Sequence, residues 1–286
     1  MTSASLNNTY DSNYHSWNTV MDIKKFNLII KGHSRGAEKT GFYIPQLKLF
    51  LDAGLQSYFE PNNILITHCH TDHTFALPML LTGIKSTPSI YVPLKHKELF
   101  ENYVNATYQL SQGDSKIKSE YPILGIKEND VIKLNNDTRA IVYNMDHSVE
   151  CCGYGLVRTK QKLKTEYATI GKEEIIKLKK NKVIVTENVS EPMVAYLTDT
   201  TTSIFDKYKE LLKYPYIIIE CTFFREDEYK LAHQAKHTHW NDLKPIIEKN
   251  QQITFLLIHF SMRYENNEIK DFFNKQNIEN ILLALE

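Results

Sequence analysis

The stretch Ile66–Pro78, ITHCHTDHTFALP, places three histidines and one aspartate within six residues: His68, His70, Asp72 and His73. Histidine is not a typical core residue and strongly favours neither helix nor strand, so folding alone gives no reason for this cluster. Neutral imidazole nitrogens and carboxylate oxygens both bind zinc at about 2.0–2.2 Å. The cluster therefore predicts a metal site. Its first two histidines and its last two residues can face two different ions as the chain turns.

Three more candidate ligands come just after apolar segments that have the length of strands. His147 follows the run AIVYNM, Asp199 follows VAYLT, and His259 follows ITFLLI. Loops at strand ends commonly carry functional residues. A single histidine at such a place is more often structural. Three such residues in a chain that already has the cluster favour a site for two metal ions.

The remaining sequence predicts one α/β domain. Residues 1–22 are polar and are interpreted as a loose N-terminal extension, and residues 23–286 as the domain. The first half of the domain is rich in strand-like runs, and the second half alternates strands with helices. This order predicts two mixed β-sheets packed together with helices on the outer faces. Two of the predicted helices cover Thr74–Gly83, interrupted early by Pro78, and Thr202–Tyr214.

The charges balance, with 34 lysines and arginines against 34 aspartates and glutamates, so nucleic-acid binding would need a local patch. The segment Arg158–Lys182 offers one, with nine Lys or Arg residues against three Glu. We interpret residues 158–185 as a short basic arm, and a solvated basic surface is the alternative. The chain shows no secretory signal, membrane-spanning run or disulfide spacing, which predicts a cytoplasmic protein without a membrane partner, with an organelle or the nucleus left open.

The histidine cluster also resembles a known signature. HCHTDH has the form HxHxDH of the metallo-β-lactamase superfamily, and within it the chain resembles the short, plant-type tRNase Z enzymes, which process the 3′ end of tRNA. The resemblance covers about residues 24–275. It rests on five segments in the family's order: LITHCHTDHTFALPML, MDHSVECCGYGL, VAYLTDTTT, IIIECTFF with HQAKHTH, and LLIHFSMRY. It implies the αβ/βα sandwich of the superfamily, with the metals at one edge.

The resemblance also implies the ligands and their metals. Two Zn2+ ions per subunit are expected, with Mn2+ or another divalent metal as the alternative. One ion would be held by His68, His70 and His147, the other by Asp72, His73 and His259, and Asp199 would bridge both. Glu220 and His237 match a Glu–His pair that lies beside the metals in the family.

The implied reaction is hydrolysis of the phosphodiester that joins precursor tRNA to its 3′ trailer, leaving a 3′-hydroxyl on the tRNA. Asp72 would orient or deprotonate the attacking water, and His237, held by Glu220, would donate a proton to the departing 3′ oxygen. Contacts with the RNA are expected from a set of basic residues: Lys160, Lys162, Lys164, His239 and Arg263. A structural role for His239 is an equal alternative.

The implied partners are precursor tRNA and a second copy of the chain, because the family commonly forms homodimers in which one subunit's arm serves the other's site. The sequence departs from the family at Thr198, where Gly is usual, at Cys221, where a smaller residue is usual, and in an arm without a Gly-Pro element. Two alternatives stay open. One is another hydrolase on this scaffold, such as a phosphodiesterase, arylsulfatase, lactonase or thioesterase, and the other is a non-catalytic RNA-binding relative.

Overall fold

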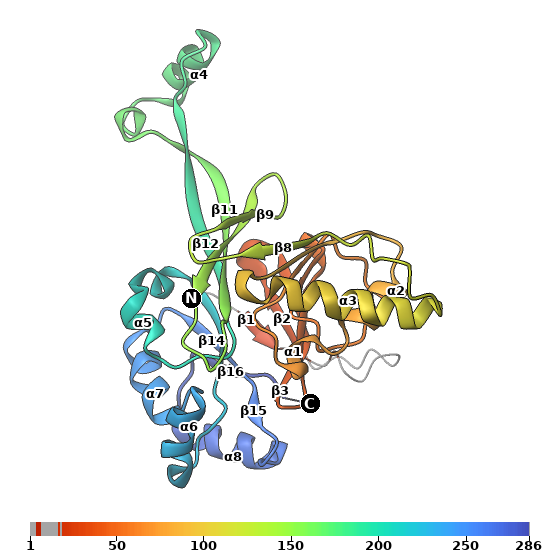
Figure 1. The fold of residues 1–286 in the computed structure, drawn as a ribbon. Coiled ribbons are helices and arrows are strands. Elements are labelled where there is room, and N and C mark those ends of the chain that lie inside the picture. Colours follow the sequence, from red (N-terminus) through yellow and green to blue (C-terminus); the bar gives the residue numbers. More distant parts are fainter. Residues whose placement is uncertain (1–3, 7–16, 18, 286) are drawn as a thin grey trace.

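The computed structural model describes residues 4–6, 17 and 19–285. Its strands form two sheets in the middle of the molecule, and most helices lie on the two outer sides (Figure 1). One side carries α2 (Leu77–Gly83) and α3 (Lys97–Gln112), and the other carries α5 (Ile204–Lys207), α6 (Tyr229–Ala235), α7 (Trp240–Lys249) and α8 (Asn266–Gln276). The predicted sandwich of two mixed sheets is confirmed.

Within the described residues the first sheet has nine strands in the order β1 to β8, with β15 added beside β3. They are β1 (Ala4–Leu6), β2 (Thr19–Ile23), β3 (Leu28–Gly36), β4 (Lys39–Ile44), β5 (Leu49–Leu51), β6 (Asn63–Leu65), β7 (Ser89–Pro93), β8 (Ile123–Ile126) and β15 (Phe260–Ser261). The strands from β1 to β5 pair antiparallel, and those from β5 to β8 pair parallel. The sheet is therefore mixed, as expected.

The predicted loose extension, residues 1–22, is shorter than expected at its C-terminal end. Residues 19–22 belong to β2, which pairs with β3, and Met21 is fully buried. Trp17 is also buried and packs edge-on against Phe50. The polar composition of this segment hides the start of β2, whose alternate side chains enter the core. The rest of the predicted extension, apart from residues 4–6, lies outside the described residues.

The second sheet has seven strands among the described residues, in the order β16-β14-β13-β12-β11-β10-β9. They are β9 (Val131–Lys133), β10 (Thr138–Asn144), β11 (Cys152–Leu163), β12 (Thr186–Leu197), β13 (Tyr216–Glu220), β14 (Thr254–Ile258) and β16 (Ile281–Leu283). Strands β9 to β12 are antiparallel, whereas β12, β13, β14 and β16 are parallel. The parallel half brings the carboxyl ends of β12, β13 and β14 to one edge.

Two predicted helices are divided in the structure. The segment Thr74–Gly83 contains the end of α1 (Thr71–Thr74) and all of α2, and Pro78 lies in the first turn of α2, where a missing N–H costs no hydrogen bond. The segment Thr202–Tyr214 forms the short α5 and then the 3-10 helix η5 (Lys209–Lys213). Across the described residues, no helix has both the length and the apolar character needed to cross a membrane. The cytoplasmic location stays a prediction.

Three layers of apolar side chains hold the sandwich together. The central layer lies between the sheets, where Phe42 from the first sheet meets Tyr196 from the second edge-on at 5.8 Å between ring centroids. A second layer packs α5 to α8 against the second sheet and includes Trp240. The third packs α2 and α3 against the first sheet and includes Phe100. Burying this apolar surface is the main source of stability, and it fixes the strand ends that carry the site.

The basic segment 158–185 forms the outer part of a long hairpin, which Figure 1 shows rising from the body with α4 (Lys172–Lys180) at its tip. Strands β11 and β12 pair from Tyr154–Tyr196 near the body to Leu163–Thr186 near the tip. A bulge at Leu156 and Val157 marks the place where the hairpin leaves the core, since the following residues of β11 become exposed. The positive charges of the segment are therefore held away from the body.

Candidate metal centre

The candidate residues come from one edge of the molecule, where several strands end. Four of them lie on the loop between β6 and α1 or on α1 itself, one ends β13, and the others follow β10, β12 and β14. In order they are His68, His70, Asp72 and His73, then His147, Asp199, Glu220 and His259. The strands are buried, whereas the residues that follow them turn towards a common space. The sheet edge thus supplies most of the site, and the fold brings it together from distant segments.

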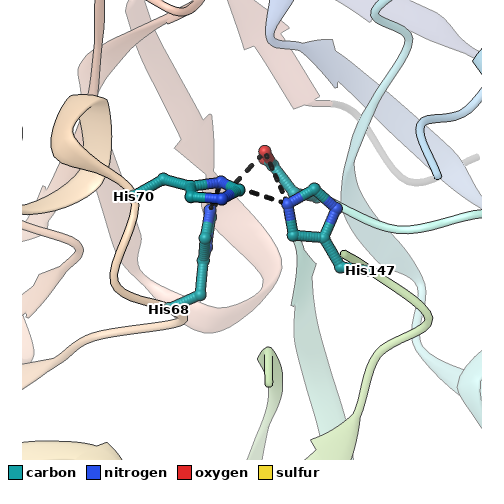
Figure 2. A group of neighbouring side chains, drawn as sticks. His68, His70 and His147 are labelled. Atoms are coloured by element: carbon teal, nitrogen blue, oxygen red, sulfur yellow. Dashed lines mark hydrogen bonds and ion pairs between the residues drawn. The ribbon is translucent and has the colours of Figure 1, made fainter. Parts of the chain in front are cut away.

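The first group contains His68, His70, His147 and Asp199 (Figure 2). The Nε2 atom of His68 lies 3.0 Å from Nδ1 of His70, and that same Nδ1 lies 3.2 Å from Nε2 of His147. An oxygen of Asp199, Oδ2, lies 3.7 Å from His68 Nε2 and 3.9 Å from His147 Nε2. Burial lowers the pKa of each of the three histidines, which favours the neutral ring that a metal needs.

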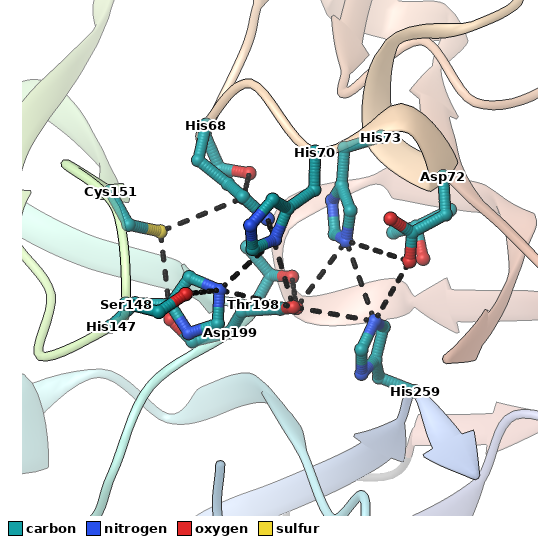
Figure 3. A network of polar contacts seen from close by, with 12 residues as sticks. His68, His70, Asp72, His73, His147, Ser148, Cys151, Thr198, Asp199 and His259 are labelled. Carbon is teal, nitrogen blue, oxygen red and sulfur yellow. Dashed lines mark hydrogen bonds and ion pairs between the residues drawn. The ribbon is translucent and has the colours of Figure 1, made fainter. Parts of the chain in front are cut away.

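The second group contains Asp72, His73 and His259, and Asp199 lies beside it (Figure 3). The Nε2 atoms of His73 and His259 are 3.4 Å apart. Asp72 Oδ2 lies 3.6 Å from the first of these atoms and 3.3 Å from the second. Asp199 places Oδ1 at 3.4 Å from His73 Nε2 and Oδ2 at 3.4 Å from His259 Nε2. Its two oxygens therefore face both groups.

The spacing of these atoms fits a metal ion in each group. Ligands at about 2.0–2.1 Å from a tetrahedral zinc ion lie about 3.3 Å from one another. The distances within the two groups run from 3.0 to 3.9 Å. Burial raises the pKa of Asp199, but the charges of His259, His73 and His68 outweigh it and hold the pKa well below the usual range. The donor set is nitrogen and oxygen only, which suits zinc and related divalent metals.

Hydrogen bonds to Nδ1 orient four of the histidine rings so that Nε2 faces the centre. His68 donates to Thr67 Oγ1 at 3.0 Å and His259 to Thr222 Oγ1 at 3.0 Å. His147 donates to the carbonyl of Lys236 at 3.2 Å, and His73 donates to Asp52 Oδ2 at 3.0 Å. Such partners fix the tautomer and strengthen the ring as a ligand. His70 differs, since its Nδ1 atom faces the centre.

Asp52 is the residue of the centre that sequence reasoning missed. It is fully buried, it follows β5, and it accepts hydrogen bonds from Thr67, His73 and Tyr196. Its φ of 60° lies in the left-handed region, which few non-glycine residues adopt. The sequence offered a signal, because Asp52 ends the apolar run LFL in the same way that Asp199 ends VAYLT.

Glu220 and His237 form a pair beside the two groups. The Nδ1 atom of His237 lies 3.0 and 3.1 Å from the two oxygens of the buried Glu220 carboxylate. Burial lowers the pKa of His237, but the charge and the hydrogen bond of Glu220 outweigh it and raise the pKa to about 9. The ring of His237 stacks on His259 at 5.5 Å and lies 5.1 Å from His147. Its Nε2 atom is left to act as a proton donor.

Asp72 is held at the opening of the centre. Its Oδ2 atom accepts a hydrogen bond of 3.1 Å from the backbone N–H of Ala37. Burial raises its pKa, but the hydrogen bond and charge of His259 and the charge of His73 lower the pKa to about 2. Asp72 is therefore ionised at neutral pH and can accept a proton, while 13% of its side chain stays exposed.

His259 has a φ of 62° and lies against Gly36 of β3. A Cβ atom at Gly36 would lie 3.1 Å from the carbonyl oxygen of His259 and 3.3 Å from its ring. The pairing of β15 with β3, which joins Phe260 to Arg35, holds this arrangement. The glycine is needed for the close approach, so a residue of the first sheet fixes a histidine that the second sheet supplies.

The structure corrects the expectation for His239. This side chain is fully buried and serves as the N-cap of α7: Nδ1 accepts from the N–H of Asn241 at 3.1 Å, and Nε2 donates to the carbonyl of Arg225 at 3.0 Å. Both ring nitrogens are used, so His239 has no group left for RNA. His237 precedes this cap and points to Glu220 instead, so the two histidines of KHTHW have different surroundings.

The other predicted RNA contacts lie outside the centre. Lys160, Lys162 and Lys164 are on the arm, where Lys160 pairs with Glu191 at 2.6 Å. Arg263 is half-exposed and donates to Glu228 at 3.0 Å, without a contact to His259. A contact of any of these four residues with RNA stays a prediction.

A cavity of about 570 Å³ adjoins the first group at His147. Its charged lining balances, since three lysines face three carboxylates: Lys95, Lys127, Lys236, Glu128, Asp146 and Glu150. Lys236 is paired with Asp146 at 3.0 Å. This side of the centre can take a polar group but does not concentrate positive charge.

The comparisons with known proteins agree with this geometry. No family model matches the chain. The chain is 29% identical over 252 residues to tRNase Z TRZ1 of Arabidopsis thaliana, and the match covers 85% of this chain and 88% of that protein. The structure of human tRNase Z, short form, matches with a TM-score of 0.54 and 16% identity over 89% of this chain and 95% of that one. The metallo-β-lactamase fold protein YhfI of Bacillus subtilis matches with a TM-score of 0.57 and 14% identity over 88% and 93%. The fold is thus the metallo-β-lactamase fold, and the sequence is similar to tRNase Z.

Proposed function

We infer that this chain is a member of the tRNase Z family, a metal-dependent endoribonuclease that removes the 3′ trailer from precursor tRNA and leaves a 3′-hydroxyl on the tRNA. The observation that carries the inference is the arrangement of two ligand groups around Asp199, with the Glu220–His237 pair beside them. This arrangement suits the cleavage of a phosphodiester, which needs a nucleophile and a proton for the leaving oxygen.

We propose that the centre binds two Zn2+ ions per subunit. The first would be held by His68, His70 and His147, the second by Asp72, His73 and His259, with Asp199 between them. The ions would supply a water of lowered pKa and would neutralise charge on the phosphate. Mn2+ can use the same ligands, because imidazole and carboxylate also suit that ion.

Asp72 prepares the attacking water. Its carboxylate is ionised, and its Oδ2 atom is fixed by the N–H of Ala37 and faces His259, so Oδ1 can accept a proton at the opening of the centre. Because the carboxylate does not have to rotate into place, the water meets an acceptor that is already oriented.

His237 serves the leaving oxygen. Glu220 holds the Nδ1–H, and Glu220 is itself held by the N–H of Thr200 at 2.6 Å and by the hydroxyl of Thr222. With a pKa of about 9, His237 is protonated at neutral pH and can donate from Nε2 to the 3′ oxygen that departs. The tRNA end of the cleaved bond therefore lies beside His237.

The hairpin of β11 and β12 supports tRNA as the substrate. Its outer part carries the excess of positive charge and stands away from the body, as an element that binds the body of a tRNA would (Figure 1). Lysines and arginines neutralise phosphates without reading sequence, which suits an enzyme acting on many tRNAs. We propose that the arm binds tRNA in a homodimer, in which the arm of one subunit serves the site of the other.

The test is cleavage of a 3′-extended precursor tRNA by purified protein of known zinc content. We expect cleavage at the end of the tRNA, a 3′-hydroxyl on the tRNA fragment, and loss of activity on removal of metal by a chelator. Asp72→Ala should lower the cleavage rate by at least about 100-fold while tRNA binding changes little. Asp271→Ala, an exposed aspartate on α8, is the matched control. Hydrolysis of small diesters without any cleavage of the precursor would replace this proposal with a phosphodiesterase, and binding without cleavage would replace it with an RNA-binding protein.

A further inference from the structure

A second cavity, of about 350 Å³, lies beside the loop that carries the first ligands. It is lined by residues from that loop and from α1 and α3: Cys69, Thr71, Thr74, Phe75, Leu99, Phe100 and Tyr103. Cys69 and Thr71 flank His70, and Thr71 precedes Asp72. Alternate residues of one short loop therefore line the cavity and supply ligands to the metal centre. A group bound in the cavity lies next to the centre.

The lining favours a flat, uncharged ring. None of the described residues that line the cavity carries a charged side chain, although charged residues make up 24% of the chain. Phe75 is 43% exposed and Leu99 is 61% exposed, so two large apolar side chains face solvent beside a hydrolytic centre. The ring of Tyr103 also lines the cavity, and its hydroxyl donates to the carbonyl of Phe75 at 3.3 Å. A phosphate would find no cationic partner among the described residues of this lining, whereas a nucleobase would find apolar and aromatic surface.

We propose that this cavity binds the base of the first trailer nucleotide, the nucleotide on the 3′ side of the cleaved bond. The proposal rests on the proposed function. Aromatic and apolar side chains stack with unpaired bases of any sequence. The volume admits one base and excludes a paired stem, so the occupant must come from single-stranded RNA, which the trailer is and the acceptor stem is not.

The position of His237 indicates that the bound base belongs to the trailer and not to the tRNA. Its ring lies among His147, His259 and Phe223, none of which lines the cavity. His237 marks the tRNA end of the bond, because it protonates the 3′ oxygen that leaves. The cavity is lined instead by residues of the loop that carries His70 and Asp72, of α1 and of α3. The strand would thus cross the centre from His237 towards Tyr103.

The experiment measures single-turnover cleavage of three precursors: one unmodified, one abasic at the first trailer nucleotide, and one abasic at the last tRNA nucleotide. For wild-type protein we expect the first abasic site to lower kcat/KM roughly 5- to 100-fold. Tyr103→Ala and Leu99→Ala should lower kcat/KM on the unmodified precursor and show little further loss on the substrate abasic in the trailer, because the base and the side chain act as one contact.

Two variants serve as controls. Tyr103→Phe keeps the ring and should keep the dependence on the base. Leu110→Ala removes an exposed leucine from the same helix, away from the cavity, and should behave as wild type. Zinc content, measured by elemental analysis, should be unchanged in every variant if the centre is intact.

Three results would overturn the proposal. If the unmodified precursor and the precursor abasic in the trailer are cleaved equally, the cavity does not bind the trailer base. The proposed function would still stand. A second contrary result is that Leu99→Ala converts a dimer to a monomer in sedimentation but leaves the dependence on the trailer base unchanged. The cavity would then be a contact between copies of the chain, and the proposed function would stand. If wild-type protein cleaves no precursor, the proposed function fails and this inference fails with it.

Discussion

The Oδ2 atom of Asp52 lies 3.0 Å from Nδ1 of His73, and both side chains are fully buried. The same carboxylate accepts hydrogen bonds from the backbone and hydroxyl of Thr67 and from the hydroxyl of Tyr196 at 2.7 Å. Thr67 in turn accepts from His68. One carboxylate therefore sets the orientation of a histidine in each ligand group, directly for His73 and through one hydroxyl for His68.

Asp52→Asn should weaken metal binding without removing a ligand. The amide keeps the shape of the side chain, but it loses the charge and one acceptor, so the ring of His73 is no longer fixed as a donor at Nδ1. We expect a 10- to 100-fold loss of zinc affinity, as is usual when such a partner is lost, measured by competition with a chromophoric chelator. Asp271→Asn is the control. Unchanged zinc affinity with lowered thermal stability would assign Asp52 to folding alone.

The Glu220–His237 pair predicts how the cleavage rate changes with pH in the alkaline range, which is the alkaline limb of the pH–rate profile. His237 must be protonated to donate to the 3′ oxygen, and its pKa is raised to about 9, so the rate should fall as pH rises through about 9. Glu220→Gln removes the charge that raises this pKa, so the fall should move to lower pH.

His237→Ala should slow cleavage about 100-fold or more and remove the alkaline limb. Zinc content must be measured in both variants, because Glu220 also holds the hydroxyl of Thr222, which accepts from His259. An alkaline limb that persists in His237→Ala at full zinc content would assign the proton to another group.

Gly36→Ala tests the close approach between the two sheets at His259. The added methyl group meets the backbone and the ring of a residue whose φ is already 62°, so we expect the ring to shift and one of two zinc ions to be lost or weakened. Elemental analysis after dialysis measures this. Gly171→Ala, where a Cβ meets no atom within 4 Å, is the control. Full zinc content in Gly36→Ala would show that β15 can move to accommodate the methyl group.

The arm can be shortened at a defined place, because Leu163 and Thr186 face each other across the hairpin. Replacing residues 164–185 with Asn-Gly should close it with a two-residue turn. We expect precursor tRNA to bind at least about 10-fold more weakly, with a smaller dependence on salt, while hydrolysis of bis(p-nitrophenyl) phosphate is unchanged. Equal losses in both assays would mean that the arm supports the body of the protein.

The sequence predicted the convergence of the seven candidate ligands, because each is a polar residue at the end of a buried strand or in one dense cluster. It did not predict the hydrogen bonds that orient these ligands. Asp52, which orients His73, accepts hydrogen bonds from Thr67, 15 residues away, and from Tyr196, 144 residues away. Such contacts depend on how the sheets pack, which no local pattern encodes.

The error at His239 has a related cause. The sequence left an RNA contact and a structural role for His239 as equal alternatives, and only the backbone shows that His237 faces Glu220 while His239 caps a helix. The sequence placed the arm at residues 158–185 but did not predict that its ends are paired strands, because a two-stranded ribbon far from the core needs no alternation of apolar and polar residues.

The pairing of β15 with β3 makes the centre depend on contact between the two sheets. Asp72 and His73 come from the half of the chain that forms the first sheet, whereas His259, at a separation of 186 residues from His73, comes from the second. The second ligand group is therefore complete only when the two halves are docked. A variant that loosens this docking should lose metal even though every ligand is still present in its sequence.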